Sequence, residues 1–196
     1  MKLILTSVDE PLAAAWETHC GEFASVHRGS ILDCECDAVV SPANSFGFMD
    51  GGIDLIYSRF FGWHVQERLQ ELIRAKHHGE LLVGAAEIVA TDHPRIPWLI
   101  AAPTMRVPMI LSESVHPYLA ARAVFLLARQ RPEIRTVAMP GLGTGVGQVA
   151  PETCARQVRA AIEDVVLGRT PFPASWDEAQ ERHQRLYTDK PRDLQY

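Results

Sequence analysis

Two glycine-rich segments hold the residues of this sequence best suited to chemistry. The first, SPANSFGFMDGGID (residues 41–54), leaves a short apolar run and enters a long segment of helical period. The second, PGLGTGVG (residues 140–147), also leaves an apolar run. Glycines expose backbone amides because they lack a Cβ, and amides at a helix N-terminus lie at its positive end. Each segment is a candidate phosphate-binding loop, although glycines also serve simply to make tight turns.

Neither segment matches the common nucleotide-binding motifs. A Walker A loop requires a lysine after its second glycine, and the alternating glycines at 141, 143, 145 and 147 lack the spacing of a dinucleotide fingerprint. Two such loops at one edge of a sheet could instead hold two phosphates between them.

Two polar side chains of the first segment extend this chemistry. Asn44 offers both a donor and an acceptor for hydrogen bonds to a ligand. Asp54 falls in the first turn of a predicted helix, whose dipole favours the charged form, so we expect a lowered pKa and a carboxylate at neutral pH. Such a carboxylate is better suited to anchoring a ligand than to acting as a strong base, or it could merely cap the helix.

The elements that would position these residues form an alternating pattern. Short runs rich in β-branched residues predict strands at 3–5, 24–27, 38–40, 83–91, 98–102 and 136–139. Segments of helical period predict helices at 11–19, 54–77, 115–129, 151–167 and 175–187. Strands that are apolar throughout are buried on both faces, which predicts an α/β protein, a three-layer α/β/α sandwich. Both glycine-rich segments then lie at the carboxyl edge of the sheet, where such folds bind ligands.

Length and composition limit the class of protein. The 196 residues, 47% hydrophobic and 22% charged, suit one globular domain, for which we expect residues 1–168, followed by a linker and helical tail at 169–196. The sequence has no apolar run of membrane-spanning length and its first residues do not resemble a secretory signal, so we expect a soluble, cytoplasmic protein. A net charge of −5 disfavours general nucleic-acid binding.

The four cysteines allow one further interpretation. Cys34 and Cys36 could both reach a zinc ion, with His77 and His78 as a second pair. Zinc ligands are usually two to four residues apart, however, so we favour two ordinary thiols and predict no metal.

Five segments together resemble the macrodomain family, whose members bind ADP-ribose and include proteins that process ADP-ribose 1″-phosphate. They are DAVVSPAN (37–44), GGID (51–54), GAAEIVAT (84–91), APTMRVP (102–108) and AMPGLGTGVG (138–147). The resemblance covers roughly residues 24–165. It implies a mixed, about six-stranded sheet with ADP-ribose lying along its carboxyl edge.

The resemblance also implies roles for individual residues. Asn44 corresponds to an asparagine that contacts the distal ribose, and Asp54 to an aspartate that orients a water for attack at the anomeric carbon. These two are the candidate catalytic residues. The candidate ligand-binding residues are Ser30, Ile31, Ala43, Asn44, Gly51, Gly52, Ile53, Gly141, Gly143, Thr144, Gly145, Val146 and Gly147.

The sequence departs from the family pattern at three positions, which marks it as a divergent member. Ser30 replaces an aspartate that binds the adenine amino group in many members, and Ser41 replaces an asparagine. Val146 stands in the loop where members tend to carry an aromatic residue; Phe46 or Phe48 could supply that ring from the first loop.

The predicted activity is hydrolysis of an ADP-ribosyl linkage at the distal ribose, without a cofactor. The substrate could be a mono-ADP-ribosylated molecule, O-acetyl-ADP-ribose or ADP-ribose 1″-phosphate. A lysine nucleophile, which resemblance to one macrodomain type would imply, is not expected because the three lysines lie far from the loops, at positions 2, 76 and 190. The alternatives are a non-catalytic ADP-ribose reader and a pocket for another nucleotide such as NAD. The oligomeric state stays open.

Overall fold

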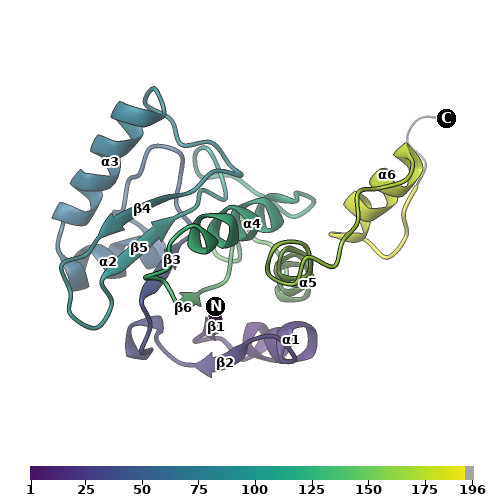
Figure 1. Cartoon of the computed structure of the whole chain (residues 1–196), viewed down its shortest axis with the longest axis horizontal. Coiled ribbons are helices and arrows are strands. Elements are labelled where there is room, and N and C mark those ends of the chain that lie inside the picture. Colours follow the sequence, from purple (N-terminus) through teal and green to yellow (C-terminus); the bar gives the residue numbers. More distant parts are fainter. Residues whose placement is uncertain (193–196) are drawn as a thin grey trace.

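The computed structural model describes residues 1–192 (Figure 1). Its strands are β1 (Lys2–Ser7), β2 (Ser25–Arg28), β3 (Ala38–Ser41), β4 (Glu87–Ala90), β5 (Trp98–Ala101) and β6 (Thr136–Met139). Its α-helices are α1 (Glu10–Cys20), α2 (Gly52–Phe61), α3 (His64–Lys76), α4 (His116–Arg129), α5 (Pro151–Ala161) and α6 (Trp176–Arg185). A short 3₁₀ helix, Ile31–Asp33, follows β2.

The strands form one mixed sheet in the order β2-β1-β6-β3-β5-β4. Every neighbouring pair is parallel except β4 and β5, which pair antiparallel. Five strands therefore end at the same edge, and β6 lies between β1 and β3 in the middle. The predicted six-stranded mixed sheet is confirmed.

Helices cover both faces of the sheet because both faces are apolar. On β3, the buried side chain of Val40 belongs to the core beneath α1, α4 and α5, whereas its neighbour Val39 belongs to the core beneath α2 and α3. Consecutive residues of a strand point to opposite faces, so an unbroken apolar run fills two cores. The α/β/α sandwich expected from the sequence is confirmed.

Three boundaries predicted from the pattern were wrong. The helix expected over 54–77 is two helices, because Gly62 has φ +104°, outside the helical region, between α2 and α3. The strand expected over 83–91 is limited to 87–90, after Gly84 with φ +94°. The helix expected over 151–167 is regular only to Ala161 and continues as a π-helical turn over Ile162–Val166.

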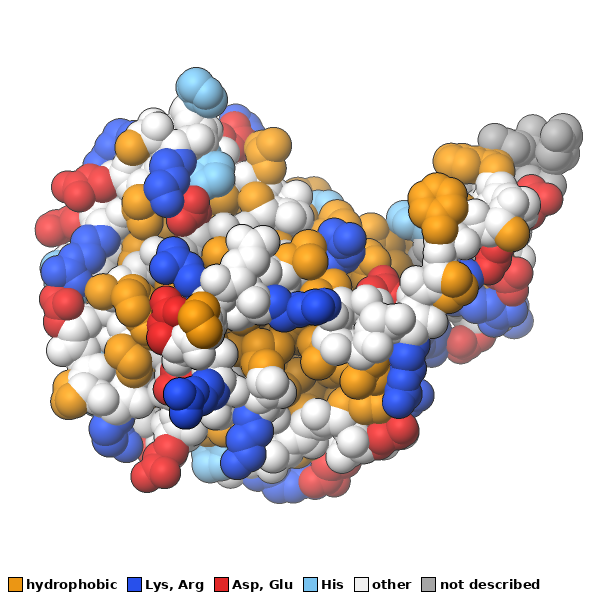
Figure 2. Space-filling view, viewed as in Figure 1, with side chains coloured by type: hydrophobic (Ala, Val, Ile, Leu, Met, Phe, Trp, Pro, Cys, Tyr) orange, Lys and Arg blue, Asp and Glu red, His pale blue; other side chains and the backbone are white. Residues whose placement is uncertain are grey.

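Residues 169–192 form an arm that stands out from the body of the molecule beyond α5 (Figures 1 and 2). Ser175 caps α6, its Oγ accepting a hydrogen bond of 3.1 Å from the amide of Glu178. The arm meets α5 through an ion pair of 2.9 Å between Arg156 and Asp189. The division into residues 1–168 and a tail stays a prediction.

None of the helices within residues 1–192 combines the length and apolar character needed to cross a membrane.

Candidate functional site

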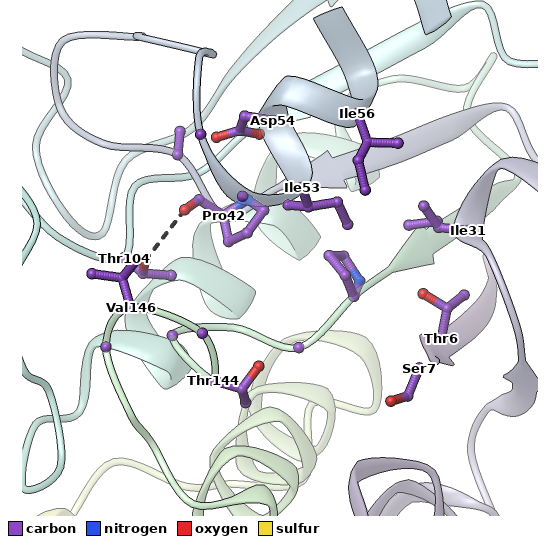
Figure 3. Close-up of a pocket in the computed structure, with 18 of the residues that line it drawn as sticks. Thr6, Ser7, Ile31, Pro42, Ile53, Asp54, Ile56, Thr104, Thr144 and Val146 are labelled. Atoms are coloured by element: carbon purple, nitrogen blue, oxygen red, sulfur yellow. Dashed lines mark hydrogen bonds between the residues drawn. The ribbon is translucent and has the colours of Figure 1, made fainter. Parts of the chain in front are cut away.

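A cleft of about 440 Å³ opens at the carboxyl edge of the sheet (Figure 3). Its lining residues come from the segments that follow all five parallel strands, within 6–12, 29–31, 42–56, 104–108 and 140–147. Parallel strands deliver their connecting loops to one edge, so five segments distant in sequence meet around one space. A cleft of this size can bury a ligand as large as a nucleotide.

The structure brings every predicted site residue to this cleft. The lining includes Ser30, Ile31, Ala43, Asn44, Gly51, Gly52, Ile53, Asp54, Gly141, Gly143, Thr144, Gly145, Val146 and Gly147. The two glycine-rich loops therefore line the same open space.

The first glycine-rich loop leads directly into the N-terminus of α2. Gly51 is the N-cap residue, and no side chain caps the helix. Gly52 has φ +54°, which glycine adopts with little strain, and a Cβ at either glycine would have no heavy atom within 4 Å. The first amides of α2 therefore face open space at the positive end of the helix, an arrangement that binds anions.

The second glycine-rich loop is held by backbone hydrogen bonds to neighbouring segments. The amide of Val149 donates to the carbonyl of Gly143 over 3.0 Å, and the amide of Leu111 donates to the carbonyl of Gly147 over 2.7 Å. A Cβ on Gly147 would lie 2.5 Å from the carbonyl oxygen of Gly143, whereas one on Gly145 would meet nothing within 4 Å. Glycine is thus required for packing at 147 and leaves the backbone accessible at 145.

The side chain of Asn44 makes its hydrogen bonds within its own loop. Its Nδ2 donates to the carbonyl of Phe48 over 2.8 Å, and its Oδ1 accepts from the amides of Phe46 and Phe48 over 3.1 and 3.3 Å. Both acceptor positions of Oδ1 are in use, so the side chain retains only one free N–H. The expected donor–acceptor pair for a ligand is therefore not free in this structure.

Asp54 differs from the sequence-based expectation in its protonation. The side chain is buried, 7% exposed, and its Oδ1 accepts a hydrogen bond of 2.6 Å from the hydroxyl of Ser41. Burial raises the pKa of Asp54 from 3.8 to about 7, and the Ser41 hydrogen bond offsets only part of that rise. The predicted lowering of the pKa was wrong, because desolvation of the inward-facing carboxyl outweighs the helix dipole.

Ser30 lies on the cleft wall but already has a partner. Its Oγ accepts a hydrogen bond of 3.3 Å from the amide of Leu32 and so caps the 3₁₀ helix that follows. The hydroxyl proton remains available as a donor.

Of the two candidate aromatic residues, only Phe48 lines the cleft. Phe46 instead packs beneath Arg106, whose guanidinium carbon lies 5.3 Å from the ring centroid. Arg106 also pairs with Glu80, with Nε and Oε1 2.6 Å apart.

Sequence reasoning missed one side of the cleft. The end of β1 and the start of α1 contribute Thr6, Ser7, Val8, Asp9 and Leu12. The same rule that placed the glycine-rich loops at the carboxyl edge applies to the end of β1, but this segment has no glycine to draw attention to it. The other lining residues not predicted are Asp50, Ile56, Thr104, Met105, Pro108 and Pro140, together with Gly29 and Pro42.

The charged side chains on the cleft wall share one sign. Among the described residues that line the cleft, the ionisable ones are Asp9, Asp50 and Asp54, and none is lysine, arginine or histidine. The part of the chain that the structure describes also contains no group of three His, Cys, Asp or Glu side chains that could hold a metal. Cys34 and Cys36 are buried free thiols.

A mixed six-stranded α/β/α sandwich whose carboxyl edge bears two glycine-rich loops is the architecture of a macrodomain. The sequence profile of the Macro domain family matches residues 40–158. The chain belongs to the Macro domain family.

Its relatives include two uncharacterized proteins. One from Aquifex aeolicus is 34% identical over 140 residues, which are 71% of this chain and 79% of that protein. One from Aeropyrum pernix is 31% identical over 147 residues, which are 75% of this chain and 74% of that protein.

Solved macrodomain structures share the fold at low sequence identity. A mutant of the Oceanobacillus iheyensis macrodomain, solved with ADP-ribose, has a TM-score of 0.62 and 16% identity, covering 81% of this chain and 86% of that one. The macrodomain of Mycobacterium tuberculosis DarG has a TM-score of 0.60 and 23% identity, covering 69% and 87%.

Proposed function

We propose that this protein binds ADP-ribose in the cleft and hydrolyses an ADP-ribosyl linkage at the distal ribose. The observation that carries the proposal is the position of Asp54, a buried carboxyl on the wall of a cleft that two glycine-rich loops also line. Family membership and the solved complex of a macrodomain with ADP-ribose support the choice of ligand.

The diphosphate is held mainly through the backbone. The amides of residues 51–53, at the uncapped start of α2, contact it from one side, and those of residues 143–147 contact it from the other. The adenosine lies toward Ser30 and Ile31, and the distal ribose lies toward Asn44 and Asp54. No side-chain cation is needed, since convergent amides can neutralise a bound phosphate.

Asp54 acts on a water molecule at the distal ribose. A pKa of about 7 lets the carboxyl exist in both forms near neutral pH, which suits a general base. In the ionised form it accepts a proton from the water, whose oxygen forms a bond to the anomeric carbon. The bond from that carbon to the acceptor breaks, and the acceptor leaves with the electron pair and takes up a proton. Ser41 holds the Asp54 carboxyl in place through Oδ1.

The test compares Asp54→Asn with the unchanged protein. Both are incubated with ADP-ribosylated protein, ADP-ribosylated nucleic acid, O-acetyl-ADP-ribose and ADP-ribose 1″-phosphate, and release of product is followed. We expect turnover to fall by about 100-fold or more with ADP-ribose affinity largely kept, as for loss of a general base. Asp177→Asn, on α6 away from the cleft, is the matched control and should keep full turnover. Equal turnover by Asp54→Asn would exclude this mechanism.

A non-catalytic reader is the second candidate, and one observation favours it. Asn44 Oδ1 already accepts two hydrogen bonds from backbone amides of the 44–48 loop. The distal ribose therefore has fewer hydrogen-bond partners than the family pattern implies. Tight binding of ADP-ribose by calorimetry, together with no release from any of the four substrates, would establish the reader. Binding of another nucleotide in place of ADP-ribose would rule out both candidates.

A further inference from the structure

We propose that the C-terminal arm joins two copies of this chain, with α6 of one copy packing antiparallel against α6 of the other. The arm lies apart from the cleft, so the inference does not depend on the proposed function. It is carried by an exposed side of α6, by the charges along that helix and by the area that the two arms can bury.

Helix α6 has one side without a partner in its own chain. Within residues 1–192 it packs along no other helix or strand. Figure 1 shows the arm standing clear of the body, with α6 beyond α5. Arg156 on α5 ties the arm to the body, donating to the carbonyl of Arg185 over 3.5 Å and pairing with Asp189 over 2.9 Å. These polar contacts hold the end of the helix and leave its other side open.

The open side of α6 carries residues with coiled-coil spacing, which we call the α6 seam. Its members are three, four and three residues apart and so lie along one side of the helix: Trp176, Ala179, His183 and Leu186. Trp176 is 62% exposed, and Phe172, just before the helix, is 94% exposed; Figure 2 shows hydrophobic side chains on the arm. Large exposed apolar side chains grouped in this way indicate a partner surface.

The charged side chains of α6 are paired away from the seam. Arg182 pairs with Glu178, and Arg185 pairs with Glu181 over 2.6 Å. Each pair joins residues four apart, which are neighbours on the surface of one helix. Because these charges are compensated within the helix, a partner can cover the seam without burying an unpaired charge.

The order of charges along α6 favours a second copy of the same helix in the opposite direction. The first half carries the carboxylates of Asp177, Glu178 and Glu181, and the second half carries the guanidinium groups of Arg182 and Arg185. Antiparallel pairing places each acidic half beside a basic half and opposes the two helix dipoles, whereas parallel pairing places like charges together. A two-fold axis relates identical chains in this way. The acidic half also disfavours a membrane surface, which attracts helices whose polar face is rich in lysine and arginine.

The two arms can bury enough surface for a reversible dimer. In the antiparallel pair, Trp176 meets Leu186 of the other copy. Ala179 meets His183, which gives a smaller layer in the middle. A buried aromatic side chain covers roughly 150 to 250 Å², so Phe172 and Trp176 of both copies supply up to about half of the roughly 1,200 to 2,000 Å² of a specific interface. We therefore expect a Kd on the order of 1 to 10 μM.

Sedimentation equilibrium of the full chain tests the proposal. We expect the mass to rise from that of one chain to that of two as the concentration passes through about 1 to 10 μM. Trp176→Glu places a charge in the seam and should weaken association by about tenfold or more. Trp63→Glu is the matched control, since Trp63 is also exposed, at 46%, but lies on the body before α3; it should leave association unchanged. Circular dichroism establishes that both variants fold.

Cross-linking tests the direction of the two helices. Gln180→Cys lies near the two-fold axis of the antiparallel pair, so mild oxidation should join two chains through a disulfide. Asp177→Cys lies far from its own counterpart and should stay unlinked. The four native cysteines are buried free thiols and do not interfere. The reverse pattern of cross-links would exclude the antiparallel arrangement.

Two further results would overturn the proposal. One is a full chain that remains a single copy at about 200 μM, well above the expected Kd. The other is flotation of a single-copy chain with vesicles of anionic phospholipid, lost in Trp176→Glu, which would make the arm a membrane-binding element. Either result leaves the proposed function of the cleft untouched, because ADP-ribose binding is measured separately by calorimetry.

Discussion

At the scale of single residues, Asp54 shows how burial changes a side chain's chemistry. A carboxyl in the first turn of an exposed helix is ionised and serves as a cap. In this protein the carboxyl turns inward to Ser41, and loss of hydration raises its pKa to about 7. The same residue type at the same helix position thus becomes a group that can exchange a proton near neutral pH.

This raised pKa has a consequence for stability. Between pH 4 and pH 7 the folded protein holds a proton on Asp54 that the unfolded chain has released, so the contribution of Asp54 is fully present below about pH 4 and is lost as the pH rises through 7. The gap between the folded and unfolded pKa values corresponds to roughly 4 kcal/mol at most.

Asp54→Asn removes this titration. We therefore expect the free energy of unfolding of the variant, relative to the unchanged protein, to rise between pH 4.5 and pH 8 by roughly 2 to 4 kcal/mol. Urea unfolding at both pH values, without ligand, measures the difference. A difference that does not change with pH would show that Asp54 titrates normally in the folded protein.

At the scale of elements, two glycines of the second glycine-rich loop are expected to have different effects on the stability of the protein and on its affinity for ADP-ribose. Gly145 has an open position for a Cβ, so Gly145→Ala should change the free energy of unfolding by less than about 0.5 kcal/mol. If the amides of this loop hold a diphosphate, the added methyl group should still weaken ADP-ribose binding, by about threefold to tenfold.

Gly147→Ala provides the contrast on the same loop. Its Cβ would lie 2.5 Å from the carbonyl oxygen of Gly143, so we expect the free energy of unfolding to fall by roughly 1 to 3 kcal/mol. Thermal unfolding and calorimetry of the two variants test the pair. Unchanged ADP-ribose affinity in Gly145→Ala would show that this loop does not approach the ligand.

At the scale of the whole molecule, the cleft and the C-terminal arm are separate. Every residue that lines the cleft lies between positions 6 and 147, whereas the arm of residues 169–192 meets α5 through Arg156. The ion pair of Arg156 with Asp189 is largely exposed at the aspartate, and exposed pairs contribute little to stability.

A chain ending at Gly168 is therefore expected to fold and to bind ADP-ribose within about twofold of the full chain, since the ion pair that joins the arm to α5 is largely exposed at Asp189 and no residue of the arm lines the cleft. Circular dichroism establishes folding, and calorimetry measures affinity. A much weaker affinity would mean that the arm supports the cleft, and the proposed division at residue 168 would be abandoned.

The sequence was enough to predict the fold class and about half of the residues around the cleft. Unbroken apolar runs require a sheet covered on both faces, and parallel strands bring their following loops to one edge. Glycine marks the loops at 51–52 and 141–147 because few other residues leave so much backbone accessible there.

Only the tertiary structure decided how the polar side chains of the cleft are used. The protonation of Asp54 depends on the depth at which it is buried, and the availability of Asn44 depends on hydrogen bonds within a loop. The contribution of β1 and the lack of basic side chains on the described cleft wall arise from segments far apart in sequence. Local sequence sets what each residue can do, but desolvation and hydrogen-bond partners come from the packing of distant segments, and these determine what it does.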